Sequence, residues 1–477
     1  MSYDEYLKNI TKRNELKKLV EQDPYRLSYH LMAPTGWLND PNGLCQFKDV
    51  HHIYFQYTPF SATWGLKIWG HYTTKDFIHY NEELPFIFPD NQYDKDGVYS
   101  GSAFIKDDEI HYFYTGNVKH IDKEYNYISD GREQNTMHIV SKDGYHFDNK
   151  KIVFTNDNYP SDCSKHVRDP KIYEKNGNYY MVLGARTLAD KGCVLMYKST
   201  DLVDWEYHMR IDSNMNYGYM WECPDLFDCE GETFLLVCPQ GMAQDGYKYQ
   251  NIYQCGYFKL DLDVENKRCT CGPFIELDYG FDIYASQTYQ DESGRRILLS
   301  WMGIPDADYD NDCTVEKGWQ HALTLPKQLT VEDGKLYQKT LDELKQLRCN
   351  SIKTELQNET IEITNASEIF IEGCTDEISI LLNNEIELKY HNQLFTLNLE
   401  KVGRGRKQRY VEIPKIKNMH LFMDHSSLEI FINDGEFVLT SRFYGKEKSN
   451  ILASGYEKMT IYSLNGYEIN EFDYNAS

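Results

Sequence analysis

The 477-residue sequence lacks the features that would place it in a membrane or on a nucleic acid. No apolar run approaches the length needed to cross a bilayer, and the charged amino terminus lacks the apolar segment of a secretory signal. Basic residues are few: 50 lysines and arginines stand against 74 aspartates and glutamates, a net charge of −24. No polybasic run offsets the resulting repulsion of anionic surfaces. We therefore expect a cytoplasmic protein whose partner is neither a nucleic acid nor a membrane.

Paired cysteine spacings are also missing. The twelve cysteines are scattered, and the closest approach, Cys269 and Cys271, has no second pair to complete a zinc site. Reduced thiols are therefore expected rather than a disulfide scaffold. Two acidic clusters, at 94–96 and 308–316, depart from the calcium-loop pattern at obligatory positions. We interpret both as solvated loops and expect no bound metal.

What the sequence does contain is three short carboxylate motifs: Trp-Leu-Asn-Asp-Pro-Asn-Gly at 37–43, Arg-Asp-Pro at 168–170 and Trp-Glu-Cys-Pro-Asp at 221–225. They nominate Asp40, Asp169 and Glu222 for one polar site. Two carboxyls that face a glycosidic bond are the usual equipment for its hydrolysis, one attacking the anomeric carbon and the other protonating the leaving oxygen. The motifs therefore predict a sugar-cleaving enzyme.

The rest of the sequence predicts an all-β fold. From about residue 45 to 335, short runs rich in Tyr, Phe, Ile and Val alternate with Asp, Asn, Gly and Lys. A weak repeat, a hydroxyl residue followed two positions later by Asp, recurs at 74–76, 141–143 and 199–201. Irregular repeats of several strands are typical of propeller blades, although stacked hairpins or a barrel fit the pattern as well.

The length exceeds that of one ordinary core and predicts two domains. Leu341, Leu344 and Leu347 share one helical face and predict the linker between them. Beyond it, the alternation at 428–432 and the Asn-Asp-Gly turn at 433–435 predict a β-sandwich. The expected parts are a short helical segment over 1–24, a catalytic domain over 25–335, a helical linker over 336–349 and a β-sandwich over 350–477.

The three motifs, in this order, resemble those of glycoside hydrolase family 32, which contains invertases, sucrose-6-phosphate hydrolases, inulinases and levanases. Further matches in the family's order lie between Tyr29 and Phe443, at 55–57, 69–71, 100–102, 282–285 and 428–435. The resemblance implies a five-bladed β-propeller, with its catalytic site at one end of the central channel, followed by a smaller C-terminal β-sandwich. Carboxylates from different blades would then face one another.

The resemblance also implies a role for each carboxylate. Asp40 would be the nucleophile that forms a covalent fructosyl intermediate, so the reaction would retain configuration and place the two reacting carboxyls about 5–5.5 Å apart. Glu222 would be the acid and base, with Trp221, Cys223 and Pro224 surrounding it with apolar bulk that favours its protonated form. Asp169 would accept hydrogen bonds from fructose hydroxyls. No metal or organic cofactor is required by this mechanism.

Seven further residues match family positions that line the fructose pocket: Asn39, Gln56, Trp64, Ser100, Arg168, Tyr284 and Trp301. The polar members would bind hydroxyls, and the aromatic members would wall the sugar ring. Each aromatic residue has a competing interpretation, because most of the 39 tyrosines and 7 tryptophans simply pack between strands.

The preferred substrate is sucrose 6-phosphate, because the segment at 25–37 looks most like the intracellular sucrose-6-phosphate hydrolase branch of the family. Intracellular hydrolysis of imported sucrose is the runner-up. Alternatives are an intracellular exo-β-fructosidase of short fructo-oligosaccharides, a fructosyltransferase and, more remotely, a non-catalytic carbohydrate-binding propeller. A phosphate requires a local basic patch, for which Lys67, His71, Arg186 and Lys248 are conceivable contributors that the sequence does not separate.

Overall fold

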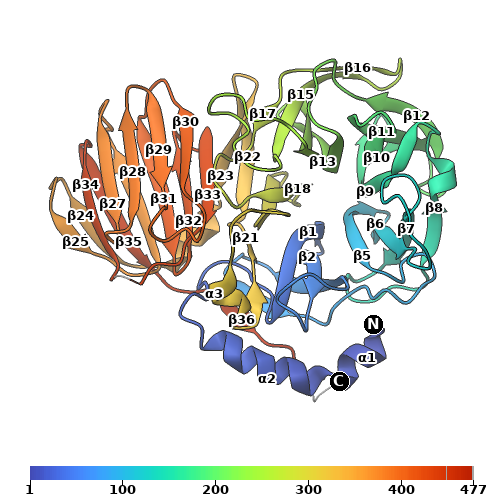
Figure 1. Ribbon diagram of the computed structural model, residues 1–477, viewed down its shortest axis with the longest axis horizontal. Helices are drawn as coiled ribbons and strands as arrows, with labels where there is room; N and C mark the ends of the chain where they lie inside the picture. The colour runs from blue at the N-terminus through green and yellow to red at the C-terminus, as the bar shows by residue number, and fades with distance from the viewer. Residues whose placement is uncertain (447, 475–477) are drawn as a thin grey trace.

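The computed structural model of the chain describes residues 1–446 and 448–474, which form two β-sheet bodies lying side by side (Figure 1). Within the described residues, the larger body is a propeller of five sheets and the smaller one is a sandwich of two six-stranded sheets. The predicted order, a five-bladed propeller followed by a C-terminal β-sandwich, is confirmed.

Each propeller blade is built from strands that follow one another in the chain, starting with the strand nearest the central channel. Blade I contains β1 (Gly36–Phe47), β2 (Val50–Thr58), β3 (Ile68–Thr74) and β4 (His79–Glu82). Blade II contains β5 (Val98–Lys106), β6 (Glu109–Lys119), β7 (Arg132–Ser141) and β8 (Lys151–Phe154). Blade III contains β9 (Cys163–Lys175), β10 (Asn178–Thr187), β11 (Gly192–Ser199) and β12 (Glu206–Ile211).

The last two blades carry an extra short strand each. Blade IV contains β13 (Met220–Cys229), β14 (Glu232–Gln240), β15 (Gly256–Asp263) and β16 (Arg268–Cys271), with β17 (Ile275–Glu276) paired to β15. Blade V contains β18 (Tyr284–Gln290), β19 (Arg296–Met302), β22 (Lys327–Glu332) and β23 (Lys335–Thr340), with β21 (Ala322–Leu323) paired to β19.

The place of a strand in its blade explains its sequence pattern. The inner strand β1 is buried along most of its length, because neighbouring blades cover both of its faces. The outer strand β4 alternates exposed and buried residues, as expected for a strand with one face in water. The three carboxylate motifs lie on inner strands, where a polar side chain needs a hydrogen-bond partner to offset its burial.

The weak repeat at 74–76, 141–143 and 199–201 marks one recurring turn, between the third and fourth strands of blades I, II and III. In each copy the hydroxyl and then the Asp carboxylate accept a backbone N–H from three residues further on, at 2.8 to 2.9 Å. Short side-chain acceptors stabilise such turns. The repeat in the sequence therefore reflects turn chemistry at equivalent places in three blades.

The sandwich packs two antiparallel sheets against each other. One sheet contains, in spatial order, β24 (Arg348–Thr354), β35 (Lys458–Leu464), β26 (Ser367–Glu372), β31 (Asn418–Asp424), β32 (Ser427–Ile432) and β33 (Phe437–Arg442). The other contains β25 (Thr360–Glu362), β34 (Asn450–Ser454), β27 (Ile378–Leu382), β28 (Ile386–His391), β29 (Leu394–Asn398) and β30 (Gln408–Glu412).

The connection between the bodies differs from the helical linker expected over 336–349. Residues up to Thr340 belong to β23, which pairs with β22 in blade V. A 3₁₀ helix, η2 (Asp342–Leu347), follows. The spacing of Leu341, Leu344 and Leu347 by three residues is the period of a 3₁₀ helix, and all three side chains are buried. The helical signal was therefore real but shorter and tighter than an α-helix.

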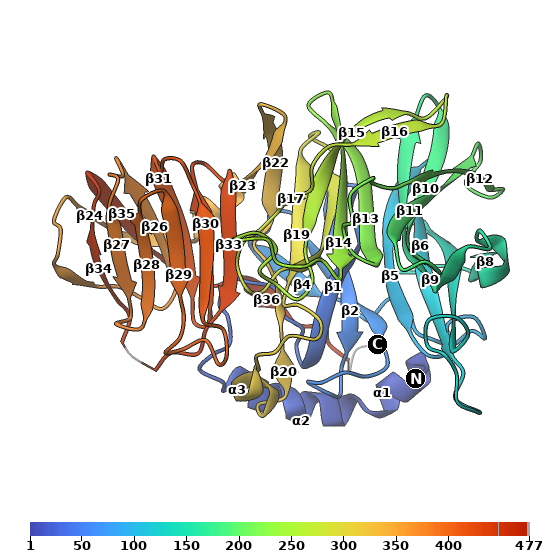
Figure 2. The same cartoon turned by 45° about the horizontal axis from the view of Figure 1, so that its top comes forward.

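The remaining helices are short: α1 (Tyr3–Lys8), α2 (Ile10–Glu21), α3 (Asp312–Val315) and the 3₁₀ helix η1 (Asn156–Asn158). In both views, α1 and α2 run along the propeller near blade I (Figures 1 and 2). Arg13 of α2 forms a buried ion pair with Glu82 of β4, which fixes the helix to that blade. In the described part of the chain, no helix combines the length and the apolar composition that crossing a membrane requires.

Blade I is completed by two segments from much later in the chain. Strand β20 (Trp319–Gln320) pairs in parallel with β1 on the inner side. Strand β36 (Glu468–Asn470) returns from beyond the sandwich and pairs in parallel with β4 on the outer side. The blade that carries the first carboxylate motif is therefore completed on both sides by segments that come later in the chain.

Four buried charged residues join the propeller to the sandwich. His30 and Lys327 come from the propeller side, and Asp424 and Glu429 come from the sandwich; we call them the junction cluster. Nδ1 of His30 lies 2.9 Å from Asp424 and Nε2 lies 3.1 Å from Glu429, while Lys327 Nζ lies 3.0 Å from Glu429. Because both ring nitrogens face carboxylates, the imidazole is held in its charged form, and charges of opposite sign alternate through the cluster.

Candidate active site

The inner strand of each blade has an irregularity in its pairing, and these irregularities lie towards the N-terminal ends of the strands. Register shifts interrupt β1 after Leu38, β5 after Val98, β13 after Glu222 and β18 after Tyr284, and another lies beside Arg168 in β9. Bulges redirect side chains and are common next to active sites. Asp169 and Cys223 also have left-handed φ angles, 64° and 49°. The regular hydrogen-bond ladders of the inner strands are therefore interrupted where the three motifs meet.

Asp40 lies in a closed ring of polar side chains from blades I and II. Asn39 Nδ2 donates to Asp40 Oδ1 at 3.0 Å and to Gln56 Oε1 at 2.8 Å. Gln56 Nε2 donates to Ser100 Oγ at 2.6 Å, and the Ser100 hydroxyl donates to Asp40 Oδ2. Burial raises the pKa of the Asp40 carboxyl, while the bonds from Ser100 and Asn39 oppose that shift. The ring fixes the direction of one carboxylate.

Asp169 connects blade II, blade III and blade IV. Its backbone N–H donates to Thr115 Oγ1 at 2.9 Å, and its Oδ2 accepts the backbone N–H of Cys223 at 2.9 Å. The Cys223 thiol also lies 3.8 Å from Asp40 Oδ2, so one residue touches two carboxylates. Burial raises the pKa of Asp169 to about 7, with Arg168 opposing the shift and the neighbouring carboxylates adding to it.

Glu222 is held at both carboxyl oxygens. Oε1 accepts from Arg168, with Nε at 3.1 Å and Nη2 closer still, and Oε2 accepts from Gln240 Nε2 at 3.0 Å and from the Tyr284 hydroxyl at 2.6 Å. The side chain keeps 14% of its surface exposed, so it faces the opening of the site. Its orientation is therefore set by groups from blades III, IV and V.

The apolar cage expected around Glu222 is not what surrounds it. Trp221 points away from the carboxyl, packs on Phe258 with ring centroids 5.0 Å apart and donates its indole N–H to a backbone carbonyl. Pro224 packs towards Gly184 of blade III. Alternation along a strand sends neighbouring side chains to opposite faces. Hydrogen-bond donors, not the flanking residues, form the environment of this carboxyl.

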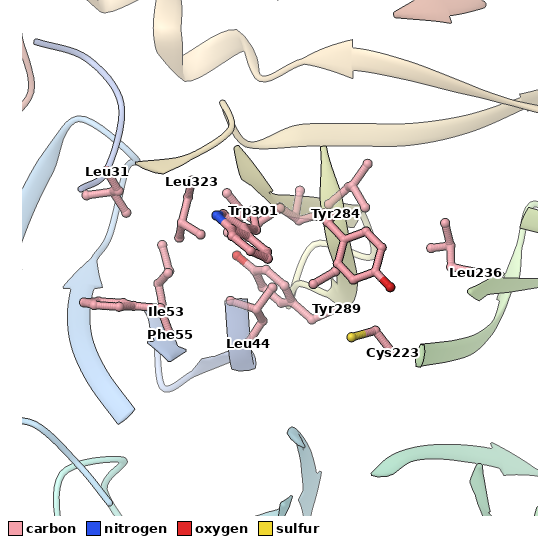
Figure 3. Close-up of a cluster of buried hydrophobic side chains, with 14 of the residues drawn as sticks. Leu31, Leu44, Ile53, Phe55, Cys223, Leu236, Tyr284, Tyr289, Trp301 and Leu323 are labelled. Atoms are coloured by element: carbon pink, nitrogen blue, oxygen red, sulfur yellow. The ribbon is translucent and has the colours of Figure 1, made fainter. Parts of the chain in front are cut away.

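Aromatic rings form a wall beside the carboxylates. Trp37 lies 6.0 Å from Trp301 and 6.2 Å from Trp64, measured between ring centroids. Trp64 is 58% exposed and stands at the rim. The Lys67 ammonium lies 4.7 and 4.6 Å from the centroids of Trp37 and Trp64. Figure 3 shows Trp301 and Tyr284 side by side in the buried cluster, with Cys223 near them. This wall can pack against a sugar ring.

The structure thus brings together all ten residues nominated by the sequence. Asp40, Asn39, Gln56 and Ser100 form one hydrogen-bonded group, and Glu222, Arg168 and Tyr284 form a second. Asp169 lies between the two groups, while Trp64 and Trp301 flank them through ring contacts. The catalytic and binding roles of these residues stay predictions.

Several residues that contact the site are not among the ten, including Trp37, Gln134 and Gln240. Gln240 ends the apolar run at 234–239, and such a polar end to a buried strand could have drawn attention to it. Trp37 lies inside the first motif and could have been included with Asn39. Gln134, which accepts from Arg168 Nη1 at 3.0 Å, belongs to no motif and carries no comparable signal.

The four basic residues considered for a phosphate differ in their surroundings. His71 is buried and stacks on Tyr54 at 4.1 Å, and Lys67 is buried between tryptophans, so neither is a rim residue. Arg186 is paired with Asp190 at 2.6 Å. Lys248 lies on an exposed loop. Of the four, Lys67 lies beside the site and forms none of the ion pairs among the described residues, but burial lowers the pKa of its ammonium well below the usual range and so disfavours the charge that a phosphate needs.

The two acidic clusters contain carboxylates that are paired with basic residues. Among the described residues, no group of three or more His, Cys, Asp or Glu side chains is arranged to hold an ion. The expectation of solvated loops is wrong for Asp94, which is fully buried and paired with Lys150 at 2.7 Å. Asp310 is paired with Arg404 at 2.9 Å.

Comparisons with known proteins agree with this geometry. Residues 30–340 match the glycosyl hydrolases family 32 N-terminal domain, and residues 344–468 match the glycosyl hydrolases family 32 C-terminal domain. The sucrose-6-phosphate hydrolase of Bacillus subtilis (strain 168) is 39% identical over 462 residues, which cover 93% of this chain and 94% of that protein.

Two solved structures are similar over nearly the whole chain. The sucrose-6-phosphate hydrolase of Lactobacillus gasseri superposes with a TM-score of 0.88 at 27% identity, covering 98% of each chain. A mutant of a Bombyx mori β-fructofuranosidase in complex with sucrose superposes with a TM-score of 0.82 at 29% identity, covering 97% of this chain and 99% of the other.

Proposed function

Because this chain belongs to glycosyl hydrolase family 32 and is a β-fructofuranosidase, we propose that it releases the fructosyl residue of sucrose 6-phosphate, with sucrose as a second substrate. The observation that carries the proposal is the meeting of Asp40, Asp169 and Glu222 at one end of the propeller. The similarity to sucrose-6-phosphate hydrolases from two organisms supports the phosphorylated substrate. A phosphorylated sugar does not cross a bilayer unaided, so this substrate implies a cytoplasmic reaction.

In the proposed reaction, Asp40 attacks C2 of the fructosyl residue and Glu222 gives a proton to the departing glycosidic oxygen. The ring formed by Asn39, Gln56 and Ser100 holds the attacking carboxylate in one direction before substrate arrives. Such preorganisation lowers the cost of reaching the transition state. The bond formed is the fructosyl ester of Asp40, and the bond broken joins C2 to the leaving oxygen.

In the second half of the reaction, Glu222 takes a proton from water, and the hydroxyl group attacks C2 to release fructose and free Asp40. Arg168, Gln240 and Tyr284 keep the Glu222 carboxyl on one side of the bond through both steps. Asp169 would accept hydrogen bonds from fructose hydroxyls and stabilise positive charge that develops at C2.

Sucrose without the phosphate is a second candidate substrate, since the Bombyx mori β-fructofuranosidase mutant with a similar structure holds sucrose. The test is kcat/KM for sucrose 6-phosphate, sucrose and a fructosyl-extended sucrose with one enzyme preparation. A strong preference for the phosphorylated sugar supports the proposal. Equal or faster cleavage of sucrose and its extended relative would make the enzyme a β-fructosidase of unphosphorylated sugars.

A further inference from the structure

A second guanidinium lies beside Arg168, and no carboxylate of the described residues neutralises it. Arg132, at the start of β7, is 4% exposed and forms none of the ion pairs among these residues. Its Nη1 donates to Nδ1 of His166 at 3.3 Å, and its Nε is buried without a hydrogen-bond partner. Tyr127 covers one face of the guanidinium at 4.3 Å. A buried cation without a counter-charge is unfavourable unless something else provides one.

His166 separates the two arginines without balancing their charge. The same ring nitrogen, Nδ1, accepts from Arg132 and from Arg168 Nη1, the latter at 3.0 Å. Nε2 faces the carbonyl oxygen of Tyr127 at 3.2 Å. Accepting at Nδ1 requires the neutral ring, and burial together with the two cations lowers the pKa of His166 to about 2. The neutral ring therefore offsets neither guanidinium, and of the two only Arg168 is paired with a carboxylate.

The position of Arg132 relates it to the leaving group. Arg168 bonds Glu222 on one side and Gln134 on the other, and Gln134 lies two residues after Arg132 on the same face of β7. Glu222, Arg168, His166 and Arg132 thus form a continuous line that starts at the carboxyl facing the leaving oxygen. Its last two residues, His166 and Arg132, lie where blade III contacts blade II.

Nearby arginines differ from Arg132 in one respect. Arg186 is paired with Asp190 at 2.6 Å, and Arg210 is paired with Asp162 at 2.7 Å. Arg132 therefore differs from these two neighbours, because its charge beside the substrate site is not neutralised by a carboxylate of the described residues. Guanidinium groups match the geometry of phosphate oxygens and bind them through two parallel hydrogen bonds.

We propose that Arg132 binds the phosphate of a phosphorylated leaving group and that His166 positions its guanidinium for that contact. The proposal rests on the proposed function, since it names the residue that would distinguish sucrose 6-phosphate from sucrose. Arg132 would contribute little to the binding of the unphosphorylated sugar, because that sugar has no charged group to place beside the guanidinium.

The test compares kcat/KM for sucrose 6-phosphate and for sucrose in the wild type and in Arg132→Gln. We expect a loss of about 10- to 100-fold for the phosphorylated substrate, the usual range for charge-assisted hydrogen bonds, and less than about 3-fold for sucrose. Arg186→Gln is the matched control, because its guanidinium is already paired, and it should leave the ratio of the two values unchanged. An equal loss on both substrates in Arg132→Gln would overturn the proposal.

The possible results distinguish a failure of the proposed substrate from a failure of the proposed phosphate site. A wild type that does not prefer sucrose 6-phosphate contradicts the proposed function. A wild type that prefers it, with an Arg132→Gln variant that keeps the preference, contradicts only the phosphate site.

If Arg132→Gln does not fold, Arg132→Lys decides by product inhibition, since lysine keeps the charge but not the paired donors. Inhibition by glucose 6-phosphate should weaken about 3- to 10-fold, while inhibition by fructose stays unchanged. Equal weakening for both products, or for neither, would overturn the phosphate site.

Discussion

Two buried clusters of charge in this molecule have opposite electrostatic character. In the junction cluster, His30 and Lys327 face Asp424 and Glu429, and the pKa of Glu429 falls to about 2 despite its burial, because Lys327 and His30 favour its charged form. In the site, three carboxylates crowd together with Arg168 as their nearest guanidinium, and the pKa values of Asp40 and Asp169 rise.

The comparison shows that burial alone does not decide what a charged group contributes. At the junction, complementary neighbours convert buried charge into a specific contact between domains. In the site, like charges remain close together, an arrangement that is unfavourable in the empty protein but attractive to positive charge that develops on a bound sugar. The first cluster serves structure, and the second is suited to chemistry.

The largest expected effect comes from Glu222→Gln. Removing the proton donor should reduce kcat on sucrose by about 10²–10⁴-fold or more, because general acid catalysis contributes that much. The thermal unfolding midpoint should be recorded as well, because the change removes the ion pair with Arg168 as well as repulsion among the carboxylates. Steady-state kinetics and calorimetry on the same preparation measure both. Unchanged hydrolysis would contradict the role of Glu222 and make the site one for binding alone.

Glu429→Gln should have the opposite signature. It leaves His30 and Lys327 buried with one carboxylate fewer, and breaking a buried pair in this way costs about 3–5 kcal/mol of stability. Activity per folded molecule should change little. Chemical denaturation followed by fluorescence measures the loss. Glu387→Gln, which breaks an exposed pair with Lys389 in the same domain, is the control and should cost at most about 1 kcal/mol.

The pH dependence of stability should report the junction cluster. Glu429 has a lowered pKa, so its contribution is complete above its unfolded value near 4.5 and is lost as the pH falls towards about 2. His30 has a raised pKa, so its contribution is complete below about 6.5 and is lost as the pH rises through its folded value. Stability from this cluster should therefore be greatest between about pH 4.5 and 6.5. Denaturation midpoints across pH 3–9 should show this maximum in the wild type and a weaker one in Glu429→Gln.

The smallest expected effect is a shift in the activity profile. The raised pKa of Asp169, about 7, means that the three carboxylates keep a proton near neutral pH. Raising the pH above about 7 removes it, so kcat/KM on sucrose should fall there. Arg168→Gln removes the cation that favours the ionised forms, so the pH at which kcat/KM falls should rise by about one pH unit. Overall activity should be lower than in the wild type. A fall in kcat/KM at the same pH as in the wild type would contradict the electrostatic coupling of these groups.

Local sequence predicted the features that depend on local chemistry. The repeated turns at 74–76, 141–143 and 199–201 could be found because each is stabilised by its own side chains. The site residues that lie inside dense motifs, such as Asn39 and Arg168, were nominated, although their roles await the experiments above.

Features that depend on distant partners left weaker signals. Gln134, His166 and Arg132 come together only because blades II and III pack side by side, and none belongs to a recognisable motif. The environment of Glu222 was misjudged because sequence neighbours on a strand point to opposite faces, so its real partners come from Arg168, Gln240 and Tyr284. The 3₁₀ helix at 342–347 was predicted too long because three leucines do not distinguish two helix types.

The pairing of β36 with β4 has a consequence for the order of events during synthesis. Asn81 of β4 and Asn470 of β36 bond at 3.0 Å yet are 389 residues apart in the chain. At translation rates of about 5–20 residues per second, β4 waits on the order of 20–80 s before its neighbour is made. An unpaired edge strand invites association with other chains during that time. The ion pairs of Arg13 and Lys17 with Glu82 of β4 join segments that are made well before β36, so they can form while β4 waits for that neighbour.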